Sequence, residues 1–225
     1  MCGRFQLSVK GKQISERFNI EVFDEKYTPS YNCAPSQKLP IIINTHPNKL
    51  SYFSWGLIPI WAKEAKIGFN NINARSETIS HKPSFKNAFK TQRCLIPANG
   101  YYEWKNDGLK TPYRIFLKEE KIFAMAGIWE VWQDAEDKKI HTFSIITTSA
   151  NTATRNIHKR MPVILQPEGE QLWLHGEDED ILQKLLIPFE SNKTDLYSIS
   201  NNVNSTRNND PSIITPSKDN QYKLF

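Results

Sequence analysis

The stretch IFAMAGIWEVW, residues 122–132, decides the fold class. Almost every position in it is apolar, and aromatic and β-branched residues recur along its length. A strand with one face in water alternates between apolar and polar residues, whereas a strand covered on both faces does not. This stretch therefore predicts the central strand of a sheet.

Further strand-like segments surround it, each rich in β-branched and aromatic residues. We expect strands at residues 39–44, 50–58, 93–98, 100–104, 111–118, 141–147 and 196–200. Asp107-Gly108 predicts a type I′ hairpin turn between 100–104 and 111–118. The polar DAEDKK, residues 134–139, predicts the turn that follows the central strand.

Helical segments are short and lie outside the run of strands. Residues 11–20 predict a helix with Ile14, Phe18 and Val22 on one face. Residues 76–90 predict a helix that is broken or restarted at Pro83. Two more helices are expected at 168–176 and 178–186. The chain thus predicts one α+β domain, built on mixed but mostly antiparallel sheet.

Composition narrows the function classes. The 225 residues are 39% hydrophobic and contain no apolar run of roughly 18 residues, so we expect no transmembrane helix and no membrane partner. No apolar signal region follows Met1, which predicts a cytoplasmic, nucleoid-associated protein, or a nuclear one in a eukaryote. The formal charge of +5 permits a polyanionic partner without requiring one.

The three cysteines, Cys2, Cys33 and Cys94, argue against a disulfide framework, since their number is odd. None of them forms a C-x-x-C pair, so we expect no structural zinc, no other metal site and no cofactor.

Cys2 is an unusual residue for a chain start, because termini are normally frayed. If Met1 is removed, Cys2 carries an α-amine and a thiol on adjacent carbons. The amine can condense with an aldehyde, and the thiol can then close a five-membered thiazolidine ring. The alternative is that Cys2 is a small buried hydrophobe.

Other segments contain polar residues at positions where a purely structural core would have apolar side chains. In NNINARSE, Asn73 and Arg75 share a face of an extended chain, and Arg75 suits a phosphate; a surface arginine with a capping asparagine is the alternative. Glu103 stands between aromatic residues in GYYEW, which favours a raised pKa and proton transfer. Strand alternation could instead turn Glu103 towards solvent.

Two more segments complete the candidates. His158 and Arg160 precede a strand-like segment in RNIHKRMPVIL, where His158 suits proton transfer and Arg160 suits a phosphate. Trp55 and Trp61 belong to the rigid SWGLIPIWA, which suits stacking on bases of single-stranded nucleic acid. Core packing is the alternative, and it fits Trp55 better than Trp61.

Taken together, these blocks resemble one family. MCGRF, YNCAP, WGLIPIWA, NARSET, RCLIPANGYYEW, MAGIWE, FSIITTSAN, IHKRMPVIL and SISNNVNSTRNNDPSIITP are similar, in this order, to the signature blocks of the SOS response-associated peptidase (SRAP) family. The resemblance implies a β-rich pseudo-barrel with flanking short helices. It places the SRAP domain at residues 1–217 and leaves a polar tail at 218–225.

The resemblance also implies a function. Family members detect abasic sites in single-stranded DNA and cross-link to them through Cys2 as a thiazolidine, which shields the lesion from strand cleavage. A monomer suffices for this role. It implies an enzyme of DNA repair with possible abasic-site lyase activity and autocatalytic peptidase activity. A cysteine peptidase with an N-terminal nucleophile is the main alternative, and a non-catalytic reader of modified bases is a third.

Site residues follow from the matching motifs. The resemblance implies a catalytic set of Cys2, Asn73, Glu103 and His158. It implies DNA contacts from Arg4, Asn32, Pro35, Trp61, Arg75, Trp104, Arg160 and either Thr147 or Thr148. Because a chain start with this role cannot fray, we also expect Cys2 to be buried and held.

Overall fold

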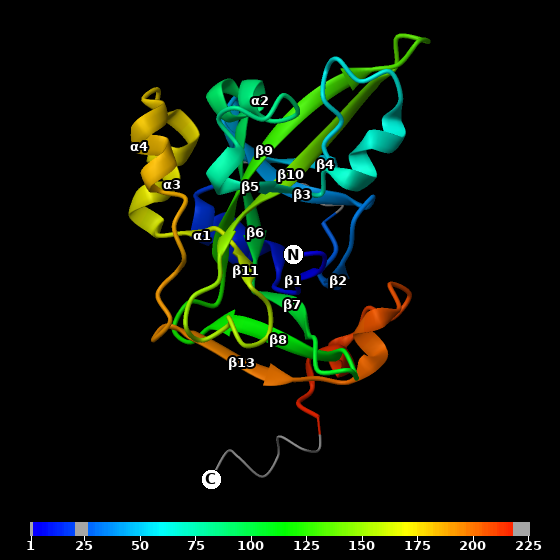
Figure 1. The fold of residues 1–225 in the computed structure, drawn as a ribbon, viewed down its shortest axis with the longest axis vertical. Coiled ribbons are helices and arrows are strands. Elements are labelled where there is room, and N and C mark those ends of the chain that lie inside the picture. The colour runs from blue at the N-terminus through cyan, green and yellow to red at the C-terminus, as the bar shows by residue number, and fades with distance from the viewer. Residues whose placement is uncertain (1, 21–26, 218–225) are drawn as a thin grey trace.

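The computed structural model describes residues 2–20 and 27–217 of the chain (Figure 1). Its centre is a closed ring of strands that contains the apolar stretch quoted above. The ring runs β10, β4, β3, β6, β9 and back to β10. These strands span Lys139–Ser149 (β10), His46–Trp55 (β4), Lys38–Ile43 (β3), Arg93–Ala98 (β6) and Phe123–Gln133 (β9).

The ring is antiparallel except between β10 and β4, where Thr142 pairs with Ser54 in parallel. Three short strands extend it. β5 (Asn73–Arg75) pairs in parallel with β10, β11 (Arg160–Pro162) pairs antiparallel with β10, and β12 (Ile164–Leu165) pairs with β9. The C-terminal half of β10 therefore brings β5 and β11 together at one rim.

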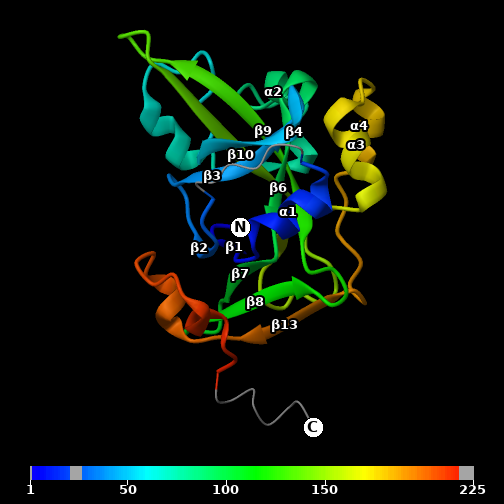
Figure 2. The same cartoon turned by 180° about the vertical axis from the view of Figure 1, so that it is seen from behind.

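A second sheet of five strands lies beside the ring, in the order β13, β8, β7, β1, β2 (Figures 1 and 2). These strands span Thr194–Ser198 (β13), Thr111–Leu117 (β8), Gly100–Lys105 (β7), Phe5–Leu7 (β1) and Ser30–Cys33 (β2). β1 lies between β7 and β2, so the start of the chain is an inner strand of this sheet.

Helices are few and short. They are α1 (Gly11–Phe18), α2 (Lys86–Thr91), α3 (Pro167–His175) and α4 (Glu179–Lys184), with 3₁₀ turns η1 (Ala65–Asn70), η2 (Ser76–Thr78), η3 (Asn201–Asn204) and η4 (Pro211–Ile214). Both views show α3 and α4 together on one side of the ring (Figures 1 and 2). In residues 2–20 and 27–217, no helix is long and apolar enough to cross a membrane.

The predicted central strand is confirmed. β9 is buried from Phe123 to Glu130 and pairs with three other strands. The core between ring and second sheet includes Trp55, whose ring packs on Phe5 at 5.4 Å and stacks on Phe143 at 6.2 Å between centroids. Core burial of Trp55 is thereby confirmed, and the α+β pseudo-barrel is the observed fold.

Most predicted elements are present, with bounds shifted by a few residues. The helical region 76–90 does break, into η2 and α2 on either side of Pro83. The type I′ turn at Asp107-Gly108 is wrong. Lys105 pairs with Thr111, which leaves a five-residue loop, and the positive φ angles lie at Gly108 and Lys110. The Asp107 carboxylate accepts hydrogen bonds from Leu109 and Thr111, and these bonds shape the longer loop.

Two expectations, Val22 on the helix face and the polar tail at 218–225, lie outside the described residues.

Candidate active site and nucleic-acid interface

Cys2 lies three residues before the start of β1 and is fully buried. The Asn73 Nδ2 donates a 2.8 Å hydrogen bond to the Cys2 carbonyl. On the other side, the Tyr102 backbone N–H donates to the Arg4 carbonyl at 3.0 Å, which continues the pairing of β1 with β7. The expectation that Cys2 is buried and held is thereby confirmed.

Glu103 comes from β7, the neighbour of β1, and its side chain is only 4% exposed. The alternative that strand alternation turns it to solvent is excluded. Burial raises the pKa of Glu103, against the opposing attraction of a protonated His158. A carboxyl group with a raised pKa is suited to give and take a proton near neutral pH.

His158 reaches the same place from the loop before β11. Its Nδ1 lies 4.0 Å from Glu103 Oε1, and its side chain is one-third exposed. The Arg160 backbone N–H donates to His158 Nδ1 at 3.0 Å. When Nδ1 accepts this bond, the neutral ring carries its proton on Nε2. His158 therefore lies between the buried Glu103 and solvent.

The Cys2 thiol is held in its neutral form. Burial raises its pKa, and the negative charge of Glu103 raises it further. Its Sγ lies 4.0 Å from the Arg4 carbonyl, to which the S–H donates weakly. The sulfur can act as a nucleophile only if a base takes the thiol proton. Glu103 is the candidate base, because its charge acts on the thiol.

A polar groove opens beside this group. It encloses about 620 Å³ and is lined by Asn70, Asn73, Arg75, Thr78, His81, Lys82 and Pro83. Arg75 is exposed at the end of β5, two residues after Asn73. The basic lining of Arg75 and Lys82 gives the groove the charge that a phosphate backbone requires. Because Asn73 also lines it, the groove adjoins the residue that holds Cys2.

Arg160 begins β11 and is largely buried, with 17% of its side chain exposed. Its guanidinium donates to both carboxylate oxygens of Glu77 at 2.9 Å, and to the hydroxyl and carbonyl of Thr147 at 3.3 and 2.5 Å. Thr147 is fully buried, and its hydroxyl donates to the Ala74 carbonyl. Thr148 is buried as well, in the β10–β11 pairing. Thr147 thus supports Arg160.

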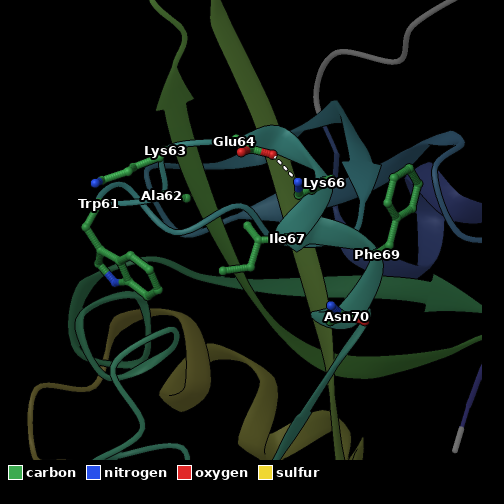
Figure 3. A pocket seen from close by; sticks show the side chains of 8 residues that line it. All are labelled: Trp61, Ala62, Lys63, Glu64, Lys66, Ile67, Phe69 and Asn70. Carbon is green, nitrogen blue, oxygen red and sulfur yellow. Dashed lines mark ion pairs between the residues drawn. The ribbon is translucent and has the colours of Figure 1, made fainter.

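A shallow apolar pocket of about 720 Å³ lies next to the groove (Figure 3). Trp61, Ile67 and Phe69 line it, with Lys63 and Lys66 at its edge, and Asn70 lines both the pocket and the groove. Trp61 and Phe69 are 53% and 69% exposed. Trp61 Nε1 donates to the Pro83 carbonyl in the groove wall at 3.2 Å. Sequence reasoning found Trp61 but missed Phe69.

The segment that carries these aromatics is fixed at its base. Gly56 has φ +134°, and a Cβ there would lie 2.8 Å from the Gly68 carbonyl oxygen. The two glycine backbones therefore touch where residues 57–67 leave and rejoin the ring. Asn71 Nδ2 donates to the Leu57 carbonyl at 3.1 Å and closes the same base. Trp61 consequently lies within an excursion from β4 that is closed at Gly56 and Gly68, and Phe69 follows directly after it.

Four other sequence candidates lie apart from the groove. Arg4 Nη1 donates to Asn32 Oδ1 at 2.7 Å and to the Val203 carbonyl at 2.8 Å. Asn32 is buried, and its Nδ2 bonds the carbonyls of residues 203, 205 and 208. Trp104 Nε1 donates to Asn204 Oδ1 at 2.8 Å. These three fasten the loop 201–209 to the second sheet, and Pro35 is half-buried after β2.

All three cysteines are free and buried. Residues 2–20 and 27–217 contain no group of three or more His, Cys, Asp or Glu that could hold a metal ion.

Known proteins resemble this chain in sequence and in fold. The chain is 48% identical over 221 residues to the abasic site processing protein YoqW of Bacillus subtilis strain 168, covering 95% of this chain and 99% of that protein. It is 30% identical to the abasic site processing protein HMCES of Rattus norvegicus, covering 85% of this chain and 66% of that protein.

A crystal structure of a protein from Bacteroides thetaiotaomicron superposes with a TM-score of 0.86 at 34% identity, covering 96% of this chain and 100% of that one. Residues 1–206 match the family model described as SOS response associated peptidase (SRAP). The chain therefore belongs to the SRAP family.

Proposed function

We propose that this protein processes abasic sites in single-stranded DNA by forming a covalent thiazolidine through Cys2 after Met1 is removed. The observation that carries the proposal is the buried Cys2, held by Asn73 and placed within the field of Glu103. The curated relatives named abasic site processing proteins support the choice of substrate.

The first step exposes the aldehyde. An abasic sugar is mainly a closed hemiacetal, and opening it moves a proton from the 1′ hydroxyl to the ring oxygen. His158 and Glu103, 4.0 Å apart, are the pair suited to this transfer. His158 is one-third exposed and meets the sugar from the solvent side, whereas Glu103 lies beneath it.

The second step forms the adduct. The Cys2 amine adds to the aldehyde carbon. The carbinolamine hydroxyl then takes a proton from Glu103 and leaves as water, which gives an iminium ion. The sulfur then adds to the same carbon, and its proton passes to Glu103. The ring nitrogen becomes a neutral amine, one water is the net product, and no oxidation state changes. Asn73 fixes the Cys2 carbonyl and so orients both nucleophiles.

Thiol capture also explains why the strand is spared. An iminium ion at the sugar carbon acidifies the neighbouring position and promotes β-elimination of the 3′ phosphate. Addition of the sulfur removes the iminium, so elimination stops. Lyase activity is therefore expected when the sulfur is missing or slow.

The DNA lies along the groove and the neighbouring pocket. Arg75 and Lys82 meet phosphates, and Trp61 and Phe69 stack with intact bases beside the lesion. Arg4, Asn32 and Trp104 act indirectly, because their side chains hold the loop 201–209. A protein with this arrangement works as a monomer.

Peptidase action is the second candidate, and the burial of Cys2 limits its scope. Cys2 is fully buried, and an outside peptide and an abasic sugar both need access to it, whereas the chain's own Met1 is already attached to it. The reaction that suits this placement is hydrolysis of the chain's own Met1–Cys2 bond. The Cys2 sulfur, after giving its proton to Glu103, takes the Met1 acyl group as a thioester and that proton passes to the released amine; water then frees methionine and restores the thiol. That cleavage supplies the amine for the DNA reaction.

One assay separates the three functions. The protein is incubated with a labelled single strand that carries one abasic site, then denatured and resolved on a gel. A cross-linker gives a shifted band that survives denaturation. A reader of modified bases gives none, and a general peptidase instead cleaves a control peptide. Absence of a shifted band contradicts the proposed function.

A further inference from the structure

Glu77 occupies the edge of the Arg160 guanidinium that is formed by Nη1 and Nη2. The guanidinium is anchored on the inner side by the hydroxyl and carbonyl of Thr147. Its outer side is taken by the two oxygens of Glu77, at 2.9 Å each. The Glu77 side chain is 51% exposed and that of Arg160 is 17% exposed. The carboxylate therefore covers the edge that a phosphate would approach.

Thr147 alone fixes the guanidinium plane, so Glu77 is not required to hold it. Two bonds from different nitrogens, Nε and Nη2, define the orientation of a planar group. Thr147 is itself immobile, because it is fully buried in β10 and its hydroxyl donates to Ala74. Glu77, by contrast, sits on the single 3₁₀ turn η2 at the surface.

A carboxylate in this position is a substitute for a phosphate. Both groups present two oxygens to the fork of an arginine, and both can accept two parallel charge-assisted hydrogen bonds from it. The pKa of Glu77 is lowered, chiefly by the hydrogen bonds from Arg160 and also by the charge of Arg75. The carboxylate is thus ionised at neutral pH and is attracted by both of the arginines that suit the DNA backbone.

We propose that Glu77 acts as an internal competitor for the phosphate site on Arg160, and thereby weakens binding of intact single-stranded DNA. This inference rests on the proposed function. DNA without a lesion must displace Glu77 to gain the Arg160 contact and leaves readily. At an abasic site, the covalent bond to Cys2 supplies the retention that the backbone contacts do not. Glu77 is therefore a specificity-determining residue.

The test is binding of an intact, labelled single strand by anisotropy, with the full chain, as a function of salt. Glu77→Gln should tighten binding roughly threefold to tenfold, as expected when one charge-assisted contact becomes available. The plot of log K against log[salt] should steepen by about 0.7, the value for one added phosphate contact on a single strand. Glu77→Ala should act in the same direction.

Two controls isolate the pair. Glu16→Gln removes the same charge from an exposed ion pair, that of Glu16 with Lys12 on α1, and should leave binding unchanged. In an Arg160→Gln background, the effect of Glu77→Gln should vanish. Tightening that persists there is through-space electrostatics and overturns the inference.

Weaker binding or an unchanged salt slope in both Glu77 variants also overturns it, because Glu77 then only steadies Arg160. These outcomes are distinct from failure of the proposed function, in which the wild-type protein fails to cross-link abasic DNA at all.

Discussion

The Asn73 side-chain amide donates a 2.8 Å hydrogen bond to the backbone carbonyl of Cys2. This bond joins a strand at the rim of the ring to the start of the chain, across 71 positions of sequence. Asn73 owes its place to the parallel pairing of β5 with β10, where it lies opposite Ile145. The barrel thus positions the residue that on sequence grounds is the nucleophile.

Asn73→Ala should therefore reduce cross-linking without unfolding the protein. Loss of one buried hydrogen bond that orients a reacting group costs about 1–2 kcal/mol, or roughly 5- to 30-fold in rate. The single-turnover rate with an abasic single strand measures the effect. Asn44→Ala is the matched control and should keep the wild-type rate, because it removes an amide directly after β3 that bonds the Thr91 carbonyl and the Trp129 indole.

Cys2→Ser separates the amine from the sulfur. The variant keeps the α-amine and forms the iminium, but its hydroxyl closes the ring poorly. We expect loss of the stable cross-link and the appearance of cleaved DNA on a denaturing gel. Sodium borohydride should restore a covalent band by reducing the trapped iminium. A Cys2→Ser protein that cross-links as stably as wild type contradicts the thiazolidine.

The raised pKa of Glu103 predicts that the stability of the protein depends on pH. Its pKa is raised in the folded protein by burial, so the folded state binds a proton that the unfolded chain gives up sooner. The stability that this bound proton contributes is complete below the ordinary glutamate pKa of about 4.3. It is lost as the pH rises through the pKa of Glu103 in the folded protein. Glu103→Gln should therefore gain melting temperature over wild type at pH 8 and lose that advantage towards pH 4.

The same variant tests catalysis. Because glutamine cannot carry the proton, the cross-linking rate should fall and lose the pH dependence that Glu103 imposes. Thermal melts and single-turnover rates across pH 4–8 measure the two effects; about 1 kcal/mol corresponds to roughly 2–4 °C in a chain of this size. An unchanged rate profile would remove Glu103 from the proton path.

Arg75→Gln should weaken binding to intact single-stranded DNA and flatten its salt dependence by about 0.7 in log K against log[salt]. Arg75 is exposed in the groove next to Asn73, where a single phosphate contact is expected. Lys12→Gln is the control, because Lys12 is an exposed cation on α1 whose partner is Glu16. Equal slopes for both variants would show that the groove carries no specific phosphate contact.

Trp61→Ala and Phe69→Ala should each weaken single-strand binding by about 1–3 kcal/mol if a base stacks on the ring. Both rings are more than half exposed, so the free energy of unfolding should change little. Leu109→Ala, an 84% exposed apolar residue on the β7–β8 loop, is the control for exposed surface. Wild-type affinity in both aromatic variants would place the DNA elsewhere.

The sequence predicted the long strands of the ring better than the short strands that pair at its edges. β9 and β6 are continuous runs of mostly apolar residues, and such segments can be recognised without tertiary contacts. β5 and β11 have three residues each and exist only because β10 supplies their partners. The same holds for β1, whose pairing with β7 makes a chain terminus into an inner strand. Local patterns do not contain such pairings.

The site shows the same division. Residue type and resemblance identified Cys2, Asn73, Glu103 and His158, but the Glu77–Arg160 pair joins residues 83 positions apart and had no local signal. Arg4 and Asn32 have the composition of a DNA contact, yet their hydrogen bonds face inward to the loop 201–209. Phe69 had no distinguishing pattern in the sequence, although its side chain is 69% exposed.

The intact mass of the DNA adduct tests the central claim most directly. The protein is incubated with an abasic single strand, without reductant, and the denatured complex is weighed. The account predicts the mass of the chain lacking Met1 plus that of the DNA, minus one water, with the Cys2 thiol no longer alkylated by iodoacetamide. An adduct that retains Met1, or one that forms only after borohydride reduction, would contradict it.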